Sequence, residues 1–395
     1  MLRKLEDLKI SFAKFKLDLV VIAVLVCAVL VLFGPLVGHL LLGAQPQFDH
    51  YWHMELARDM ARDHTIRTPH FLFQLLVIPM AGLLGNYPRS GAIIVVASYV
   101  ILAVLLYITL RDSADRWISA LSAIALMLIW PIPLLAGFDR HFYFGYIPGS
   151  VYHNPTILLL KPLTIVLFVF STRFFMAPFR SSINTIVILM AVVVLSAMAK
   201  PSYLICLLPA LALVASYRLV RKRPVDWRAL VIGVTLPAAA MLAWQYLQTY
   251  ATGHGSIAFA PFLVARHFSE WLLPKFFLSI AFPLAVTALF FSRVVSDVRM
   301  RLAWLGAIIG LFCFYFLIEA GPGVNTFHGN FGWSGVITLF VLFFASTVFL
   351  LEQWKVHRLE ETPKWPLVLS TVILGLHVIS GVVWHALGWN ARQYW

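Results

Sequence analysis

Long apolar segments, separated by short polar stretches, recur along the whole chain. A helix that crosses a bilayer needs about 20 mostly apolar residues, and most of these segments approach that length. The pattern predicts about eleven spans, at residues 17–43, 91–110, 118–137, 156–171, 184–199, 202–217, 229–248, 276–292, 302–319, 334–351 and 366–385. No polar stretch is long enough to bury a core of its own. The sequence therefore predicts an all-α polytopic membrane protein in which residues 1–395 form one membrane-embedded domain, without a soluble domain.

The apolar stretch 71–85 is shorter than a span and contains Pro79. The basic residues indicate whether it crosses, because Lys and Arg are enriched in cytoplasmic loops. If it does not cross, most of the 30 Lys and Arg residues fall in the N-terminal segment and in alternate loops on the same side. We therefore expect this stretch to lie in the interface or to re-enter, with the N-terminus cytoplasmic. The outer loops are then 44–70, 137–155, 200–201, 248–275 and 320–333.

The composition agrees with a membrane protein, because 61% of the residues are hydrophobic and 12% are charged, against about a quarter charged in soluble domains. The net charge of +13 is distributed between apolar segments. Basic residues in these positions set the orientation of a membrane protein and contact anionic lipids, so the charge does not indicate nucleic-acid binding. The basic flank and long apolar stretch of the first segment predict a retained span rather than a cleaved signal peptide. Neither a disulfide framework nor a zinc site is expected from the three cysteines, which all lie in apolar runs: Cys27, Cys206 and Cys313.

The segment after the first span predicts a helix at the membrane surface. Trp52, Leu56 and Met60 recur at i, i+4 and i+8, which is typical of an amphipathic helix lying in the interface. Asp49 precedes this helix. Its carboxylate could serve a site at the membrane surface, or it could simply cap the helix. His50 and His53 lie beside it, but two histidines without a third ligand favour interface or core positions over a metal site.

Two further groups of polar residues occupy the predicted outer face. The first combines aromatic rings with directional donors and acceptors, as a sugar or lipid-headgroup site requires, although an interfacial aromatic belt has a similar composition. Its polar members are Asp139, Arg140, His141, Tyr152, His153 and Asn154. The second group is later in the chain, where loop polarity alone is the simpler interpretation: Arg266, Glu319, His328 and Asn330.

Lys161 and Lys200 each precede a proline at the edge of an apolar run. A lysine at membrane depth costs about 2.5–3.5 kcal/mol unless it reaches the interface or an anion. These two residues therefore either extend to the membrane surface or bind a phosphate or pyrophosphate group. No nucleotide-binding or hydrolase motif is present.

The N-terminal pattern resembles the GT-C superfamily of integral-membrane glycosyltransferases. A first span leads to an outer loop with an early acid, Phe48-Asp49-His50-Tyr51. A juxtamembrane helix follows, and then a proline-led apolar stretch that begins Pro69-His70-Phe71-Leu72. The resemblance is specific over residues 17–117 and general over 118–395. It implies a GT-C-like fold in which the proline-led stretch lies on the outer side.

The resemblance also implies a function and a site. The donor would be a polyprenyl-phosphate-linked sugar, and the acceptor a hydroxyl on a lipid, glycan or protein. Asp49 would be the general base of an inverting transfer, with Lys161, Lys200 and Arg266 binding the donor phosphate. The sugar or acceptor would contact His50, His53, Asp139, Arg140, His141, Tyr152, His153, Asn154, Glu319, His328 and Asn330. Many relatives have two acids where this chain has one, so we expect no cofactor and no required metal. A bacterial cytoplasmic membrane, with the active face outside, is the expected location.

Two other functions remain open. A polymerase or ligase of lipid-linked oligosaccharides would rely on a late outer loop rich in Arg and His, whereas residues 248–275 hold few of them. A transporter or flippase would show internal repeats and charges near the membrane midplane, whereas this chain has charges at span edges and no repeat of fixed period. A purely structural membrane subunit is a further alternative.

Overall fold

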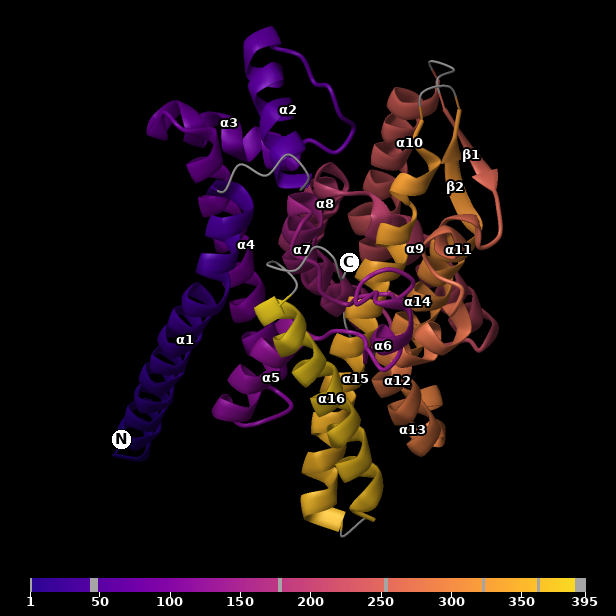
Figure 1. Ribbon diagram of the computed structural model, residues 1–395. Helices are drawn as coiled ribbons and strands as arrows, with labels where there is room; N and C mark the ends of the chain where they lie inside the picture. Colours follow the sequence, from indigo (N-terminus) through magenta and orange to yellow (C-terminus); the bar gives the residue numbers. More distant parts are fainter. Residues whose placement is uncertain are drawn as a thin grey trace.

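The protein is a bundle of apolar helices (Figure 1). The computed structural model describes residues 2–42, 49–176, 180–251, 255–321, 324–360 and 363–387. Within these residues, nine helices are long and apolar enough to cross a membrane. They are α1 (Leu2–Leu42), α4 (Tyr87–Leu110), α7 (Pro155–Arg173), α9 (Ser202–Val220), α10 (Leu236–Tyr250) continuous with the π-helical η1 (Ala229–Thr235), α12 (Leu272–Leu289), α14 (Val298–Phe316), α15 (Gly332–Glu360) and α16 (Trp365–Leu387). The polytopic membrane class is therefore confirmed.

The other two predicted spans coincide with shorter apolar helices, α5 (Arg116–Leu128) and α8 (Ile183–Ala199). The predicted span at 118–137 was too long, because α5 ends at Leu128. Pro131 and Pro133 follow, and proline both lacks an amide N–H and disfavours a helical conformation in the preceding residue. Residues 71–85 form α3 (Leu72–Leu84). At 1.5 Å per residue it is about 20 Å long, which is short of the roughly 30 Å needed to cross.

Helix α15 forms the centre of the bundle. Of its most apolar 18-residue window, 94% is buried. Gly310 of α14 lets that helix approach closely, because a Cβ atom there would lie 2.6 Å from the carbonyl oxygen of Ser334. Gly381 similarly brings α16 against the end of α5, where a Cβ would lie 1.3 Å from the carbonyl oxygen of Leu128. In a bilayer the lipid is as apolar as the side chains, so helices associate through close packing, which small residues permit.

One end of the bundle carries two groups of polar contacts. Asp18 of α1 accepts hydrogen bonds from Tyr107 at 2.7 Å and from Arg116 at 3.2 Å. Ser113, in the α4–α5 turn, donates to Glu352 of α15 at 3.3 Å, and Glu352 pairs with Arg299 at the start of α14. These contacts, and the position of the N-terminus (Figure 1), show that several of the basic loops share one end of the molecule.

The opposite end carries α2 (Asp49–Asp63), α3 and a small antiparallel sheet of β1 (Ser256–Phe259) and β2 (Leu317–Ala320). Ser256 pairs with Ala320, and Phe259 with Leu317. The all-α prediction missed this sheet. The predicted span at 302–319 was correspondingly too long, because α14 ends at Phe316 and β2 follows.

Helix α2 exists as predicted, but its orientation differs. It stands upright beyond the upper ends of α1 and α4 (Figure 1) and does not lie flat across them. Trp52 is 64% exposed whereas Met60 is buried, so the residues of the predicted apolar stripe do not share one buried face. The residues that α2 buries are His50, Met54, Ala57 and Met60. This face packs on α3 and α4.

Candidate functional site

Asp49 is the first residue of α2, and its carboxylate faces the start of α7. The side-chain amide of Asn154 donates to Asp49 Oδ2 at 2.7 Å. Asn154 is also the N-cap of α7, and its Oδ1 accepts from the backbone N–H groups of Thr156 and Ile157, both at 3.1 Å. Because the cap occupies Oδ1, the amide nitrogen of Asn154 is left to bind Asp49. Among the described residues, no hydrogen bond occupies the other carboxylate oxygen of Asp49.

Lys200, at the end of α8, joins Asp49 through the same cap. Its Nζ donates to Thr156 Oγ1 at 3.3 Å, and Thr156 Oγ1 donates to Asn154 Oδ1 at 2.7 Å. The ammonium also lies 5.0 Å from the ring centroid of Trp333, in a cation–π contact. The side chain of Lys200 is 7% exposed. We call Asp49, Asn154, Thr156 and Lys200 the Asp49–Lys200 network.

The network contains one anion and one cation at neutral pH. Burial by itself raises the pKa of Asp49. The nearby His153, the hydrogen bond from Asn154 and the charge of Lys200 outweigh burial and lower this pKa below its usual value. Burial lowers the pKa of Lys200 to about 8, and the negative charge of Asp49 limits the decrease. The site therefore presents an ionised carboxylate and a protonated amine on neighbouring helix ends.

Three histidines pack around the start of α2. His50 is completely buried, and its Nε2 donates to the carbonyl oxygen of Tyr152 at 2.9 Å. His53 Nδ1 accepts from the Gln74 side chain of α3 at 2.8 Å, and the rings of His53 and His70 are 6.3 Å apart. His50 thus fastens α2 to the loop before α7. His53 is partly exposed beside Asp49, where it can contact a ligand.

We expect acidification to destabilise the protein through His50. Burial lowers the pKa of this imidazole to about 4, whereas an unfolded histidine has a pKa of about 6.5. The stability from neutral His50 is complete above pH 6.5 and falls as the pH decreases, by about 2 kcal/mol at pH 5. Thermal unfolding in detergent at pH 7.5 and pH 5 measures this loss.

The His50→Gln variant should lose less stability between these two pH values than the wild type. His267→Gln serves as the matched control, because His267 is exposed, and it should leave the pH dependence unchanged. An equal acid loss in the wild type and in His50→Gln would contradict the assignment.

Glu319 lies on β2, not at the end of a helical span as predicted. It accepts hydrogen bonds from the Tyr250 hydroxyl at 2.9 Å and from Asn330 Nδ2 at 2.6 Å. The negative charge of Glu319 also opposes the effect of burial on the pKa of Lys200, so this carboxylate acts on the Asp49–Lys200 network. The side chain of His328 lies outside the described part of the chain, as does the whole of Phe48.

The predicted aromatic cluster divides into two parts. Asp139, at the end of α6 (Ala136–Asp139), forms an ion pair with Lys275 of α12, whose side chain is completely buried. Asp139 therefore neutralises a buried lysine. Arg140 is exposed, in a left-handed conformation with φ of 60°, and His141 is partly buried.

The other part of the cluster belongs to the Asp49 site. The His153 ring lies 5.4 Å from the ring of Tyr143 and 5.7 Å from that of Trp333. Tyr152 is buried, and its backbone carbonyl accepts the hydrogen bond from His50. The ring of Tyr143 packs on His153, and the ring of Trp333 packs on Lys200. Both rings therefore place flat apolar faces beside the Asp49–Lys200 network.

The other predicted phosphate ligands lie apart from the network. Lys161, on α7, is 2% exposed; its Nζ donates to Ser150 Oγ at 3.3 Å and lies 4.6 Å from the ring centroid of Phe340. It is seven residues after Asn154, so it shares a helix face with the cap, about 10 Å deeper. Arg266, on α11 (Leu263–Phe268), is exposed and packs over Phe262. No described contact joins Arg266 to the network.

Sequence reasoning did not select Gln74, Thr156 or Trp333 as site residues. Gln74 had a detectable signal, because it is a polar residue inside the apolar stretch 71–85. It is completely buried and orients His53. Thr156 also had a signal, since it follows Asn154-Pro155 at the start of a predicted span. Trp333 was indistinguishable from an interfacial tryptophan.

Within the described residues, no group of three or more His, Cys, Asp or Glu side chains is arranged to hold a metal ion. In comparisons with known proteins, no family model, curated protein or solved structure matches this chain.

Proposed function

We propose that this protein is a membrane glycosyltransferase that moves a sugar from a polyprenyl-phosphate donor to an acceptor hydroxyl. The supporting observation is the Asp49–Lys200 network, in which a partly exposed carboxylate and a buried lysine are linked through a helix cap. Transfer from a phosphate-linked sugar needs a base for the acceptor and a cation for the departing phosphate, and the network contains one of each.

In the proposed reaction, Asp49 accepts the proton of the acceptor hydroxyl. The acceptor oxygen forms a bond to the anomeric carbon with inversion. The bond from that carbon to the phosphate oxygen breaks, and its electron pair leaves with the polyprenyl phosphate. Lys200 stabilises the growing charge on that phosphate. A phosphate leaves without being protonated, so a single carboxylate is sufficient.

The surroundings of the network suit a sugar. Trp333 and Tyr143 supply apolar faces, while His53, His153 and Glu319 supply directional polar groups. Lys161 lies deeper along α7, where it is buried and hydrogen-bonded to Ser150, and we assign it to the part of the donor that enters from the bilayer. We assign Arg266 a secondary role in phosphate binding at the outer surface.

The distribution of basic residues supports an orientation with the site outside. Arg111 and Arg116 pair with Asp18, and Arg299 pairs with Glu352, at the end of the bundle opposite Asp49, where the N-terminus lies. Cytoplasmic ends of membrane proteins are enriched in Lys and Arg. We therefore propose a bacterial cytoplasmic membrane protein with a cytoplasmic N-terminus and a periplasmic or extracellular active face, acting in cell-envelope glycan synthesis.

The proposal predicts transfer by the purified protein in detergent. Polyprenyl-phosphate sugars would be incubated with envelope lipids, glycans and proteins, and sugar transfer followed by mass spectrometry. A protein in detergent has no bilayer across which to move a substrate. A flippase would therefore yield no product, whereas a transferase should transfer the sugar. A deletion strain should lose one sugar from its envelope glycans. If the strain keeps every glycan and no donor supports transfer, the proposal is wrong.

A further inference from the structure

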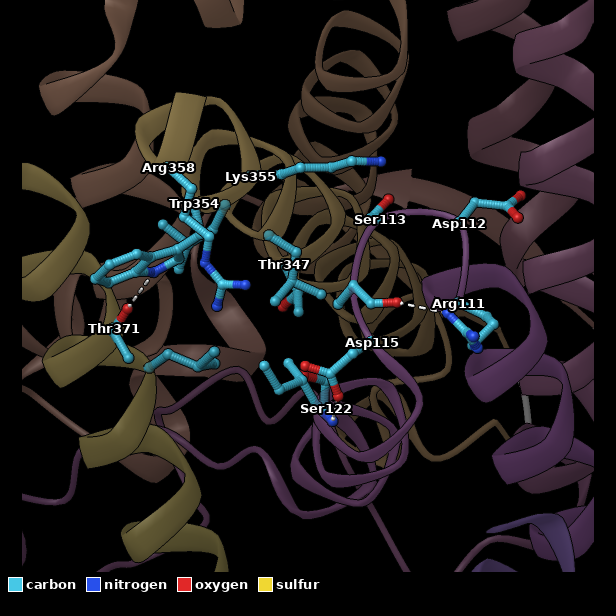
Figure 2. Close-up of a pocket in the computed structure, with 15 residues that line it drawn as sticks. Arg111, Asp112, Ser113, Asp115, Ser122, Thr347, Trp354, Lys355, Arg358 and Thr371 are labelled. Atoms are coloured by element: carbon cyan, nitrogen blue, oxygen red, sulfur yellow. Dashed lines mark hydrogen bonds between the residues drawn. The ribbon is translucent and has the colours of Figure 1, made fainter. Parts of the chain in front are cut away.

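A second polar site lies at the end of the bundle opposite Asp49. A cavity of 610 Å³ opens between the α4–α5 turn and the hairpin of α15 and α16. Figure 2 shows side chains from these segments converging on it. The polar residues that line it include Arg111, Ser113, Ser122, Lys355, Arg358 and Thr371. The proposed glycosyl transfer uses none of them.

Two of the cations at this cavity are available to a ligand. Lys355 and Arg358 are exposed, and within the described residues neither forms an ion pair. They are three residues apart on α15, so they share a helix face. In Figure 2 the guanidinium of Arg358 points into the cavity, and Lys355 extends across its rim.

The other charges at the cavity are already engaged or face away. Arg111 contacts Asp18 at 3.3 Å and donates to the carbonyl oxygen of Ala114 at 3.0 Å. Asp115 caps α5, where its carboxylate accepts from two backbone N–H groups at 3.0 Å. The carboxylate of Asp112 points away from the cavity (Figure 2). Lys355 and Arg358 are therefore the charged side chains facing the cavity that have no hydrogen bond or ion pair among the described residues, which favours an anionic ligand.

The remaining lining is apolar, and this favours an amphiphile over a small soluble anion. Side chains from α5, α15 and α16 contribute to it, namely Ile118, Leu350, Leu351 and Leu374. Next to the cavity, Leu121 of α5 and Val372 of α16 are 67% and 53% exposed, as expected of faces that contact acyl chains. Trp354 donates from its indole to Thr371 at 3.2 Å, in the manner of an interfacial tryptophan.

We propose that this cavity binds the phosphate-bearing headgroup of an anionic phospholipid. Arg358 and Lys355 bind the phosphate, and the acyl chains extend along the exposed faces of α5 and α16. The site joins the α4–α5 turn to the α15–α16 hairpin, so a bound lipid stabilises the packing of these elements. The inference does not depend on the proposed function of the Asp49 site.

Native mass spectrometry of the purified protein, with phosphatidylglycerol added to a phosphatidylcholine background, tests this site. Each basic residue near a membrane surface contributes enough attraction for about a fivefold change in binding. Arg358→Gln and Lys355→Gln should therefore each weaken phosphatidylglycerol binding about fivefold. Lys364→Gln removes the same charge from the neighbouring α15–α16 connection, outside the cavity lining, and should have little effect.

Three results would overturn the inference. An equal loss in Lys364→Gln would show that the variants act only through general surface charge. Complete displacement of the lipid by glycerol 1-phosphate at equal concentration would show that the cavity prefers a soluble phosphate. Retained binding in the single variants would be followed by the Lys355→Gln/Arg358→Gln double variant, and wild-type affinity there would also reject the site.

Discussion

Replacing Asp49 by Asn should reduce sugar transfer at least about a hundredfold, because general base catalysis typically contributes 10²- to 10⁴-fold. The two side chains have nearly the same shape, and the amide oxygen of Asn can still accept the hydrogen bond that Asn154 donates to Asp49 in the wild type. The variant therefore removes the base while the cap of α7 and the start of α2 keep their contacts. Initial rates in detergent, at saturating donor and acceptor, measure the effect.

Asp59→Asn is the matched control for Asp49→Asn. Asp59 lies on the same helix and pairs with Arg62 at 2.9 Å near the surface, away from the network. The transfer rate of the Asp59→Asn variant should stay within about twofold of the wild-type rate. Its free energy of unfolding should change by no more than a few tenths of a kcal/mol. If Asp49→Asn folds and transfers sugar at the wild-type rate, Asp49 does not act as the base.

The spans were predictable because a bilayer imposes a length and a composition on each crossing helix. The predictions failed where a local pattern carries no such constraint. Strands β1 and β2 have four residues each and pair across more than fifty intervening positions, so neither shows a strand signal by itself. The end of α5 at Leu128 could have been predicted from Pro131 and Pro133. The buried face of α2 depends on what lies beneath it, which only the fold determines.

Prediction of the site from the sequence was limited in a similar way. Asp49, Asn154 and Lys200 could each be selected from local sequence, but their association could not be predicted. The hydrogen bond from Asn154 to Asp49 joins residues that are 105 positions apart. Asp139 lies in an aromatic and polar stretch that indicated a ligand site, and the fold also pairs it with the buried Lys275, 136 positions along the chain. A polar residue in an apolar chain thus indicates a partner, and the fold decides which one.

The N-terminal cap of α7 also positions the two charged groups of the site. A cap is a local requirement of any helix, because the first backbone N–H groups lack partners within the helix. Here the capping residue Asn154 also fixes Asp49, and Thr156, in the first turn, fixes Lys200. Both charged groups are therefore positioned by a rigid helix start, although they belong to flexible side chains on other elements. Such positioning is what a preorganised catalytic pair requires.

Lys200→Gln should lower the rate of transfer about 10²- to 10³-fold, the usual effect of removing one group that stabilises developing negative charge. Glutamine keeps a hydrogen-bond donor for Thr156 but has no charge for the donor phosphate. Lys200→Arg keeps the charge, so it should retain much more activity than Lys200→Gln.

The pH dependence separates a catalytic cation from a structural one. Burial lowers the pKa of Lys200 to about 8, so the wild-type amine is protonated below this pH and loses its proton above it. If the protonated form is required, the wild-type rate falls as the pH rises from 7 to 9.5. Arginine remains charged throughout, so the Lys200→Arg rate should not show this decrease, and Lys200→Gln should stay low at every pH. An identical alkaline decrease in the wild type and Lys200→Arg would assign the decrease to another group and remove the support for Lys200 as the phosphate ligand.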